Sequence, residues 1–153
     1  MIKIYIGCSL THAPQDFLAL VDKVKSELKK EYEVLEFLGL SKGTSEDVYK
    51  QDIQRNIVQC DMFVAICDHP SIGLGYEMAA ALEKYSKPTI ALAKEGSQIS
   101  RLALGINHPM YTFKYYKDFA EILSLIKEKE QKHFKSNPIS EASNTEVCDV
   151  CTV

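Results

Sequence analysis

Short apolar runs alternate with longer amphipathic stretches five times along this chain. A run such as 61–67 is almost entirely apolar, which is typical of a strand buried on both faces of a parallel sheet. The stretches between the runs space their apolar residues three and four apart, as helices require. A strand followed by a helix, repeated five times, predicts right-handed crossovers and a doubly wound parallel α/β sheet.

The pattern gives a boundary for each element. The predicted strands cover residues 2–7, 32–37, 61–67, 88–93 and 110–115. The predicted helices cover residues 16–30, 45–59, 74–85, 100–104 and 118–131. We expect one Rossmann-like (flavodoxin-like) sheet with strand order 2-1-3-4-5 in a domain spanning residues 1–134. Residues 135–153 are rich in Ser, Asn, Thr and Glu, so we expect a polar, disordered or loosely attached tail.

Composition limits the class of protein. The chain has 153 residues, of which 46% are hydrophobic and 25% charged, which fits one globular domain. Eighteen Lys and Arg against 21 Asp and Glu give a net charge of −3, so a nucleic-acid partner is not expected. The apolar stretches are far shorter than the roughly 20 residues of a membrane span. We therefore expect a soluble, cytoplasmic protein with no membrane partner.

The five cysteines argue against a disulfide framework, because the number is odd. Cys8, Cys60 and Cys67 lie in or beside apolar runs, where a free thiol behaves as a small hydrophobe. Cys148 and Cys151 form a Cys-x-x-Cys pair, but no second pair stands at zinc-finger spacing. A metal or redox role for this pair is not favoured.

A ligand of such a sheet binds outside the carboxyl ends of the strands. The loop at 68–77 is the most informative of the loops there, because it contains Gly73 and Gly75 before a helix. We expect these glycines to turn the backbone tightly and to let a ligand approach, while the helix start offers amide hydrogens to an anion. A dinucleotide-binding motif is excluded, because Met78 stands where its third glycine would be and the loop follows the third strand.

Two acids and a tyrosine are the candidate reactive groups. Glu77 is expected in the first turn of its helix, either as a surface residue that complements the dipole or as a buried nucleophile that the helix terminus keeps ionised. Asp52 lies within a predicted helix, and its rivals Asp47 and Asp61 are better suited to complement a dipole and to cap a junction. Tyr5 is either a core aromatic or a hydroxyl that positions a carboxylate.

Together these segments resemble the nucleoside 2-deoxyribosyltransferase family, which includes the 2′-deoxynucleoside 5′-monophosphate N-glycosidases. The resemblance covers residues 2–129 and rests on four motifs: Tyr5-Ile6-Gly7-Cys8-Ser9, Gln51-Asp52-Ile53 with Cys60-Asp61, Pro70-Ser71-Ile72-Gly73-Leu74-Gly75-Tyr76-Glu77, and Lys87-Pro88. The third motif is specific, whereas a lone Gly-x-Gly would not be.

The resemblance implies retaining glycosyl transfer. Glu77 matches the family nucleophile, which forms a covalent deoxyribosyl intermediate; Asp52 matches the acid that assists base departure, and Tyr5 the hydroxyl that holds the nucleophile. We expect transfer of the deoxyribosyl group of a 2′-deoxynucleoside to another base. The alternatives are hydrolysis of 2′-deoxynucleoside 5′-monophosphates to base and deoxyribose 5-phosphate, and a non-catalytic nucleotide-binding module. Base preference and the choice between ribose and deoxyribose stay open.

The resemblance also implies how the substrate is held. Ser9, Ser71 and Ser100 match serines that bind a 5′-phosphate, Ser100 acting from a neighbouring subunit. The other expected substrate-binding residues are Gly7, Gly73, Gly75 and His69. We therefore expect a small nucleoside or nucleotide as partner, no cofactor, no metal, and a homodimer or higher homo-oligomer. The apolar helical segment 78–82 fits either an interface or the core.

Overall fold

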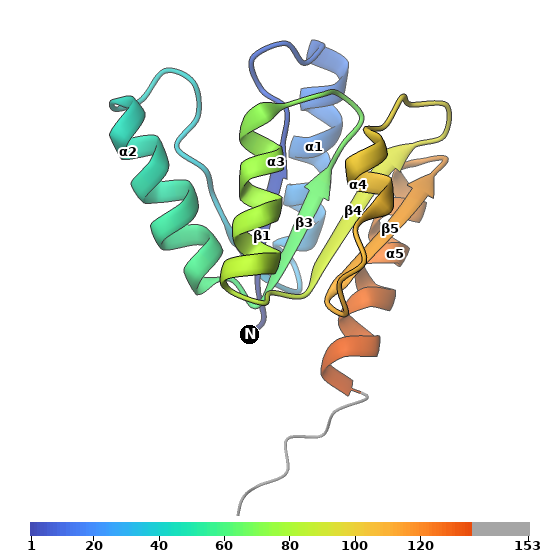
Figure 1. Cartoon of the computed structure of the whole chain (residues 1–153). Helices are drawn as coiled ribbons and strands as arrows, with labels where there is room; N and C mark the ends of the chain where they lie inside the picture. The colour runs from blue at the N-terminus through green and yellow to red at the C-terminus, as the bar shows by residue number, and fades with distance from the viewer. Residues whose placement is uncertain (136–153) are drawn as a thin grey trace, which may run out of the picture.

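The structure, a computed structural model, describes residues 1–135 as one parallel sheet with helices on both faces (Figure 1). The predicted tail, including Cys148 and Cys151, lies beyond residue 135 and so outside the described residues. Cys8, Cys60 and Cys67 are free thiols. Within the described part of the chain, no helix is long and apolar enough to cross a bilayer.

Five strands form the sheet in the order β2-β1-β3-β4-β5, which confirms the predicted topology. The strands are β1 (Lys3–Cys8), β2 (Glu33–Leu35), β3 (Met62–Ile66), β4 (Thr89–Lys94) and β5 (Tyr111–Tyr116). All neighbouring pairs are parallel. The strand order reverses at β1, because β2 lies on one side of it and β3 on the other.

Strand β2 is shorter than the predicted run at 32–37. It pairs with β1 only from Lys3 to Tyr5, so the carboxyl half of β1 has a neighbour on one side alone. The chain leaves the sheet after Leu35, and the next carbonyl, that of Glu36, accepts a hydrogen bond from the side chain of Asn56 at 2.9 Å. The edge of β1 is therefore open where the site lies.

The helices follow the predicted ranges closely. They are α1 (Gln15–Leu28), α2 (Ser45–Tyr49), α3 (Ile72–Ala79), α4 (Arg101–Gly105) and α5 (Phe119–Glu130). Three of them continue as π-helical stretches, η1 (Lys50–Ile57), η2 (Ala80–Lys84) and η3 (Gln131–Lys135). Thr44 and Asp47 form a capping box at α2, while Ser71, Ser100 and Asp118 cap α3, α4 and α5.

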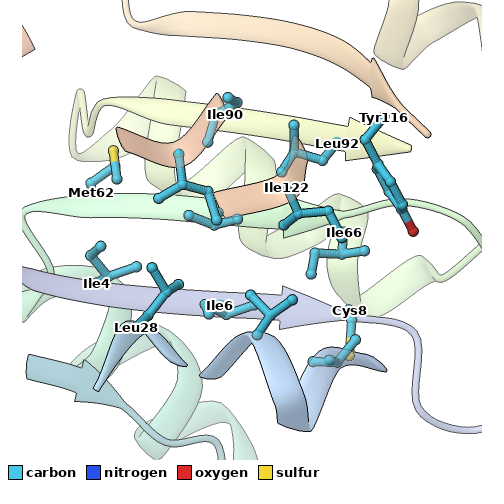
Figure 2. Close-up of a cluster of buried hydrophobic side chains, with 14 of the residues drawn as sticks. Ile4, Ile6, Cys8, Leu28, Met62, Ile66, Ile90, Leu92, Tyr116 and Ile122 are labelled. Atoms are coloured by element: carbon cyan, nitrogen blue, oxygen red, sulfur yellow. The ribbon is translucent and has the colours of Figure 1, made fainter. Parts of the chain in front are cut away.

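The alternation of side chains along β1 separates two cores. Ile4, Ile6 and Cys8 face α1 and α5 and pack in the cluster shown in Figure 2. Tyr5 points to the opposite face, into a second cluster with residues of η1 and α3. Met78, Ala81 and Leu82 are buried, so most of the segment 78–82 belongs to the core rather than to a free interface.

A buried hydrogen bond fixes the carboxyl end of the sheet. The Tyr116 hydroxyl, whose residue is 1% exposed, donates to Asp68 Oδ2 at 2.6 Å, and Asp68 Oδ1 accepts from the Lys94 amide at 3.1 Å. Asp68 begins the loop that leads from β3 to α3. This carboxylate therefore ties the ends of β4 and β5 to the loop that carries the third motif.

Replacing Tyr116 with Phe should lower the free energy of unfolding by about 1–3 kcal/mol, because a hydrogen bond to a charged acceptor is lost. Urea denaturation followed by circular dichroism measures the change. Tyr115→Phe is the matched control, since Tyr115 is 43% exposed and is expected to have little effect. Equal midpoints for the wild type and Tyr116→Phe would show that the bond contributes nothing to stability.

Candidate active site

The candidate site lies at the carboxyl end of β1, where the strand order reverses. Tyr5 and Gly7 come from β1, Glu77 from α3 and Asp52 from η1. These residues are distant in the sequence, and the parallel sheet brings them together. Among residues 1–135, no group of three or more His, Cys, Asp or Glu side chains is placed to hold a metal ion.

Tyr5 and Glu77 form the central contact. The Tyr5 hydroxyl donates a hydrogen bond to Glu77 Oε1 at 2.7 Å. The Tyr5 ring is fully buried and stacks on Phe63, with 5.5 Å between the ring centroids. Tyr5 is thus a core aromatic whose hydroxyl also binds a carboxylate, and its role in a reaction stays a prediction.

Gly7 makes room for that carboxylate. A Cβ atom at this position would lie 2.5 Å from Glu77 Oε2 and 2.9 Å from Phe63 Cζ. Contacts this short require something to move, so any larger residue would displace the Glu77 side chain or the ring. Gly7 lies two residues beyond Tyr5 and therefore on the same face of β1. The close approach of Glu77 to this face is what demands a glycine here.

The position of Glu77 corrects the prediction that it lies in the first helical turn. Ser71 caps α3 and Ile72 is its first residue, so Glu77 falls in the second turn, and the first turn holds no acid. The helix terminus therefore does not hold it ionised. Burial raises the pKa of Glu77 to about 7; the hydrogen bond from Tyr5 opposes this rise, and the charge of Asp52 adds to it.

Asp52 is the acid that η1 brings near Glu77. Its Oδ1 accepts a hydrogen bond from the Leu38 amide at 3.4 Å, and burial raises its pKa above the ordinary range. The two rival acids have other partners: Asp47 belongs to the capping box of α2, as expected, whereas Asp61 Oδ2 accepts from the Lys3 amide at the start of β1, at 2.7 Å.

Two buried polar residues near the site were not identified from the sequence. Asn56 is 2% exposed, and besides its bond to the Glu36 carbonyl it accepts a hydrogen bond from Gln51 at 3.2 Å. Lys25, on α1, is 4% exposed. Asn56 follows Asp52 by four residues and so shares its helix face, which was the one available signal. Lys25 looked like an ordinary surface lysine in an amphipathic helix.

The expected substrate-binding loops lie around this centre. Ser9 is 2% exposed, and its hydroxyl donates to the Pro70 carbonyl at 3.4 Å. The hydroxyl oxygen of Ser71 accepts from the Leu74 amide at 3.2 Å. The expectation of a tight turn at Gly73 and Gly75 is wrong, because both lie inside α3 and neither has a positive φ. A Cβ atom added at Gly73 would have Ser71 Oγ as its nearest neighbour, at 3.8 Å, and one added at Gly75 would have no neighbour within 4 Å.

Two other predicted residues have partners within the chain. The His69 ring packs edge-on against Phe17, with 4.8 Å between centroids. The Ser100 hydroxyl oxygen accepts from the amides of Leu102 and Ala103, which makes it the cap of α4. The structure does not join either residue to the Tyr5–Glu77 pair by a hydrogen bond, so their roles toward a ligand stay predictions.

The buried carboxyl predicts a pH-dependent gain in stability for Glu77→Gln. The pKa of Glu77 rises from 4.5 to about 7 on folding, so the wild type loses stability as the pH rises through this window. The neutral amide avoids this loss. The variant should thus gain relative to the wild type with rising pH, by up to about 3 kcal/mol at pH 8.

Urea denaturation at pH 5 and pH 8 measures this difference. Glu83→Gln removes an exposed carboxylate from the same helical segment and is the matched control. A gain for Glu77→Gln that is the same at both pH values would contradict the buried, raised-pKa carboxyl.

Comparisons with known proteins identify the family. No family model matches the sequence. A Thermofilum pendens protein, provisionally named 2′-deoxynucleoside 5′-phosphate N-hydrolase 1, is 30% identical over 132 residues, which cover 80% of this chain and 90% of that protein. The solved structure of the Clostridium botulinum CMP N-glycosidase covers 82% of this chain and 98% of its own, with a TM-score of 0.59 and 21% identity.

The structural likeness to the Clostridium protein shows a shared fold. The 30% identity with the Thermofilum protein shows common descent. This identity runs along most of both chains. The chain therefore belongs to the nucleoside 2-deoxyribosyltransferase family and is an enzyme of its deoxyribosyltransferase and nucleotide N-glycosidase group.

Proposed function

We propose that the enzyme hydrolyses the N-glycosidic bond of 2′-deoxynucleoside 5′-monophosphates, releasing the free base and deoxyribose 5-phosphate. The observation that carries the proposal is the buried Glu77 carboxyl held by Tyr5 at the reversal of strand order. The names of the Thermofilum and Clostridium proteins support hydrolysis of a nucleotide over the base exchange first expected from the sequence.

The geometry gives each reactive group a role. Tyr5 holds Oε1 of Glu77, so we assign Oε2 to attack the anomeric carbon. As the new C–O bond forms, the bond from the sugar to the base breaks, and Asp52 donates its proton to the departing base. Water then attacks the anomeric carbon of the Glu77 ester and gives up a proton to Asp52. Both carboxyl groups return to their starting state.

The ionisation of Glu77 depends on the charge of Asp52. Burial is the largest cause of the raised pKa at each, and the charge of Asp52 raises the pKa of Glu77 further. The reactive form needs Glu77 ionised and Asp52 protonated. Protonation of Asp52 removes the negative charge beside Glu77 and so favours ionisation of the nucleophile, which makes this form self-consistent.

The start of α3 suits a 5′-phosphate. The Ser71 oxygen accepts from the Leu74 amide, so its own proton stays available to a ligand. The open space above Gly73 and Gly75 lets a phosphate approach the first turn, where the helix favours an anion. Ser9 lies beside this loop through its bond to Pro70. These features support Ser9, Ser71 and the two glycines as the phosphate-binding group.

Exposed apolar side chains near the same loops support an oligomer. Ile72 at the start of α3 is 95% exposed and Leu102 on α4 is 81% exposed. Exposed apolar surface beside a binding site is typical of a surface that contacts another protein. We infer that a second copy of the chain covers them and that its Ser100 reaches the phosphate.

The function is tested by incubating the enzyme with deoxynucleoside 5′-monophosphates, the free deoxynucleosides and the corresponding ribonucleotides, each with and without an acceptor base. We expect free base and deoxyribose 5-phosphate from the deoxynucleotides without an acceptor. Glu77→Ala should lower kcat at least 1,000-fold, by about the amount that loss of a nucleophile costs. Glu83→Ala is the control.

Other product patterns would replace the proposal. A new nucleoside formed only with an acceptor base would establish transfer, and cleavage of ribonucleotides alone would change the sugar. Full activity in Glu77→Ala would remove Glu77 from the mechanism.

Mixing two impaired variants tests the shared site. Glu77→Gln and Ser100→Ala should each cleave the monophosphate slowly at low substrate concentration. If Ser100 acts across a dimer interface, random exchange of subunits restores one intact site in half of the dimers, or about one quarter of wild-type activity. Activity of the mixture equal to the mean of the separate variants would show that each chain completes its own site.

A further inference from the structure

Two side-chain amides of η1 bind one backbone carbonyl beside the candidate site. The Glu36 carbonyl, just after β2, accepts hydrogen bonds from Asn56 Nδ2 at 2.9 Å and from Gln51 Nε2 at 3.2 Å. Gln51 Nε2 also donates to Asn56 Oδ1 at 3.2 Å, so the two amides hold each other. A carbonyl oxygen has two lone pairs, and side chains bind both of them here. We call Gln51, Asn56 and the Glu36 carbonyl the amide clamp.

The winding of η1 allows both amides to reach the same carbonyl. Gln51 and Asn56 are five residues apart, and the hydrogen bonds of a π-helix join residues five apart. The two side chains therefore lie on successive turns of one face. In an α-helix of 3.6 residues per turn they would point about 140° apart. Asn56 is 2% exposed, so the inner end of the clamp is shielded from water.

The amide clamp lies two residues before the contact that holds Asp52. The Leu38 amide donates to Asp52 Oδ1 at 3.4 Å, and Leu38 follows Glu36 by two residues. This distance is near the upper limit for a hydrogen bond, so a shift of about 0.3 Å in the segment 36–38 is enough to break it. The contact that orients Asp52 therefore depends on how firmly the clamp holds the Glu36 carbonyl.

The Leu38 amide also favours one oxygen of Asp52 as the proton carrier. A protonated carboxyl group has one oxygen that bears the proton and one that does not. An N–H donor binds best to the oxygen without the proton, which is Oδ1 here. The proton is then on Oδ2, from which it can be given to a departing base. At Glu77 the oxygens are divided in the same way, because Tyr5 binds Oε1.

We propose that Asn56 is a positioning residue for proton transfer to the departing base, and that it acts on Asp52 through the segment 36–38. The inference rests on the proposed function, because it takes Asp52 as the acid. Gln51 is the second member of the clamp and acts on the same carbonyl. Asn56 is assigned no contact with the substrate, so its effect reaches the reaction only through Asp52.

A purely structural role for Asn56 predicts a different result. A buried amide that only satisfies a backbone carbonyl would, when replaced, lower stability and impair the site whatever residue stands at position 52. A role through Asp52 predicts a loss of rate only while Asp52 is present as the acid. The two roles therefore differ in how a change at Asn56 combines with a change at Asp52.

The deciding experiment is a double-mutant cycle on kcat, measured with the deoxynucleoside 5′-monophosphate that the wild type cleaves fastest. The variants are Asn56→Leu, Asp52→Asn and their combination; Leu has nearly the shape of Asn but neither donates nor accepts. We expect Asn56→Leu to lower kcat about 10- to 100-fold in the wild type, and less than about threefold in Asp52→Asn. Gln54→Leu replaces an exposed amide of the same helix and should leave kcat unchanged.

Equal fold losses from Asn56→Leu with and without Asp52 would overturn the proposal, as would a kcat for Asn56→Leu equal to that of Gln54→Leu. If Asn56→Leu does not fold, Gln51→Leu takes its place in the same cycle, because it removes the other donor to the Glu36 carbonyl.

A wild type that cleaves no nucleotide would overturn the proposed function instead. Hydrogen exchange of the Leu38 amide, read by NMR without substrate, then tests the clamp by itself. We expect this exchange to be at least about tenfold faster in Asn56→Leu than in Gln54→Leu, because the contact with Asp52 opens more often. Equal exchange rates would show that the clamp does not hold Asp52 and would overturn the inference as well.

Discussion

The burial of one carboxyl group, that of Glu77 against the hydroxyl of Tyr5, constrains the rest of the site. A carboxyl taken out of water needs a donor, which Tyr5 supplies from β1, and space, which Gly7 supplies two residues later. Both requirements fix how α3 lies over β1. The loop before α3 must then place the helix start correctly, and the bond between Tyr116 and Asp68 anchors that loop to the far strands.

Burial has a cost that the reaction has to overcome. With a pKa of about 7, the Glu77 carboxyl, the nucleophile of the proposed reaction, is partly protonated near neutral pH. Tyr5 and Lys25 favour the ionised form, and a charged Asp52 opposes it. In the proposed reaction this balance couples stability to activity, because the ionised state assigned to attack the sugar is the one that weakens the fold.

Because β2 ends early, at Leu35, the segment that follows it contacts helices from both faces of the sheet. Past Leu35, the side chains of Glu36 and Phe37 contact Lys25 of α1. The Glu36 carbonyl accepts a hydrogen bond from Asn56 of η1. The Leu38 amide donates one to Asp52, also of η1. A longer β2 would use these backbone groups in the sheet. The open edge of β1 therefore exchanges ladder hydrogen bonds for contacts that hold Asp52, Asn56 and Lys25.

The sequence by itself determined the five strand–helix units, the strand order and the residues of the motifs, because hydrophobic periodicity and capping are local and a family motif is read residue by residue. Only the tertiary structure decided that β2 stops at Leu35, that Glu77 lies in the second turn of α3, and that Lys25 and Asn56 are buried. These facts depend on contacts between elements distant in the chain, and the ionisation of a buried carboxyl is set by the charges and the burial that such contacts create.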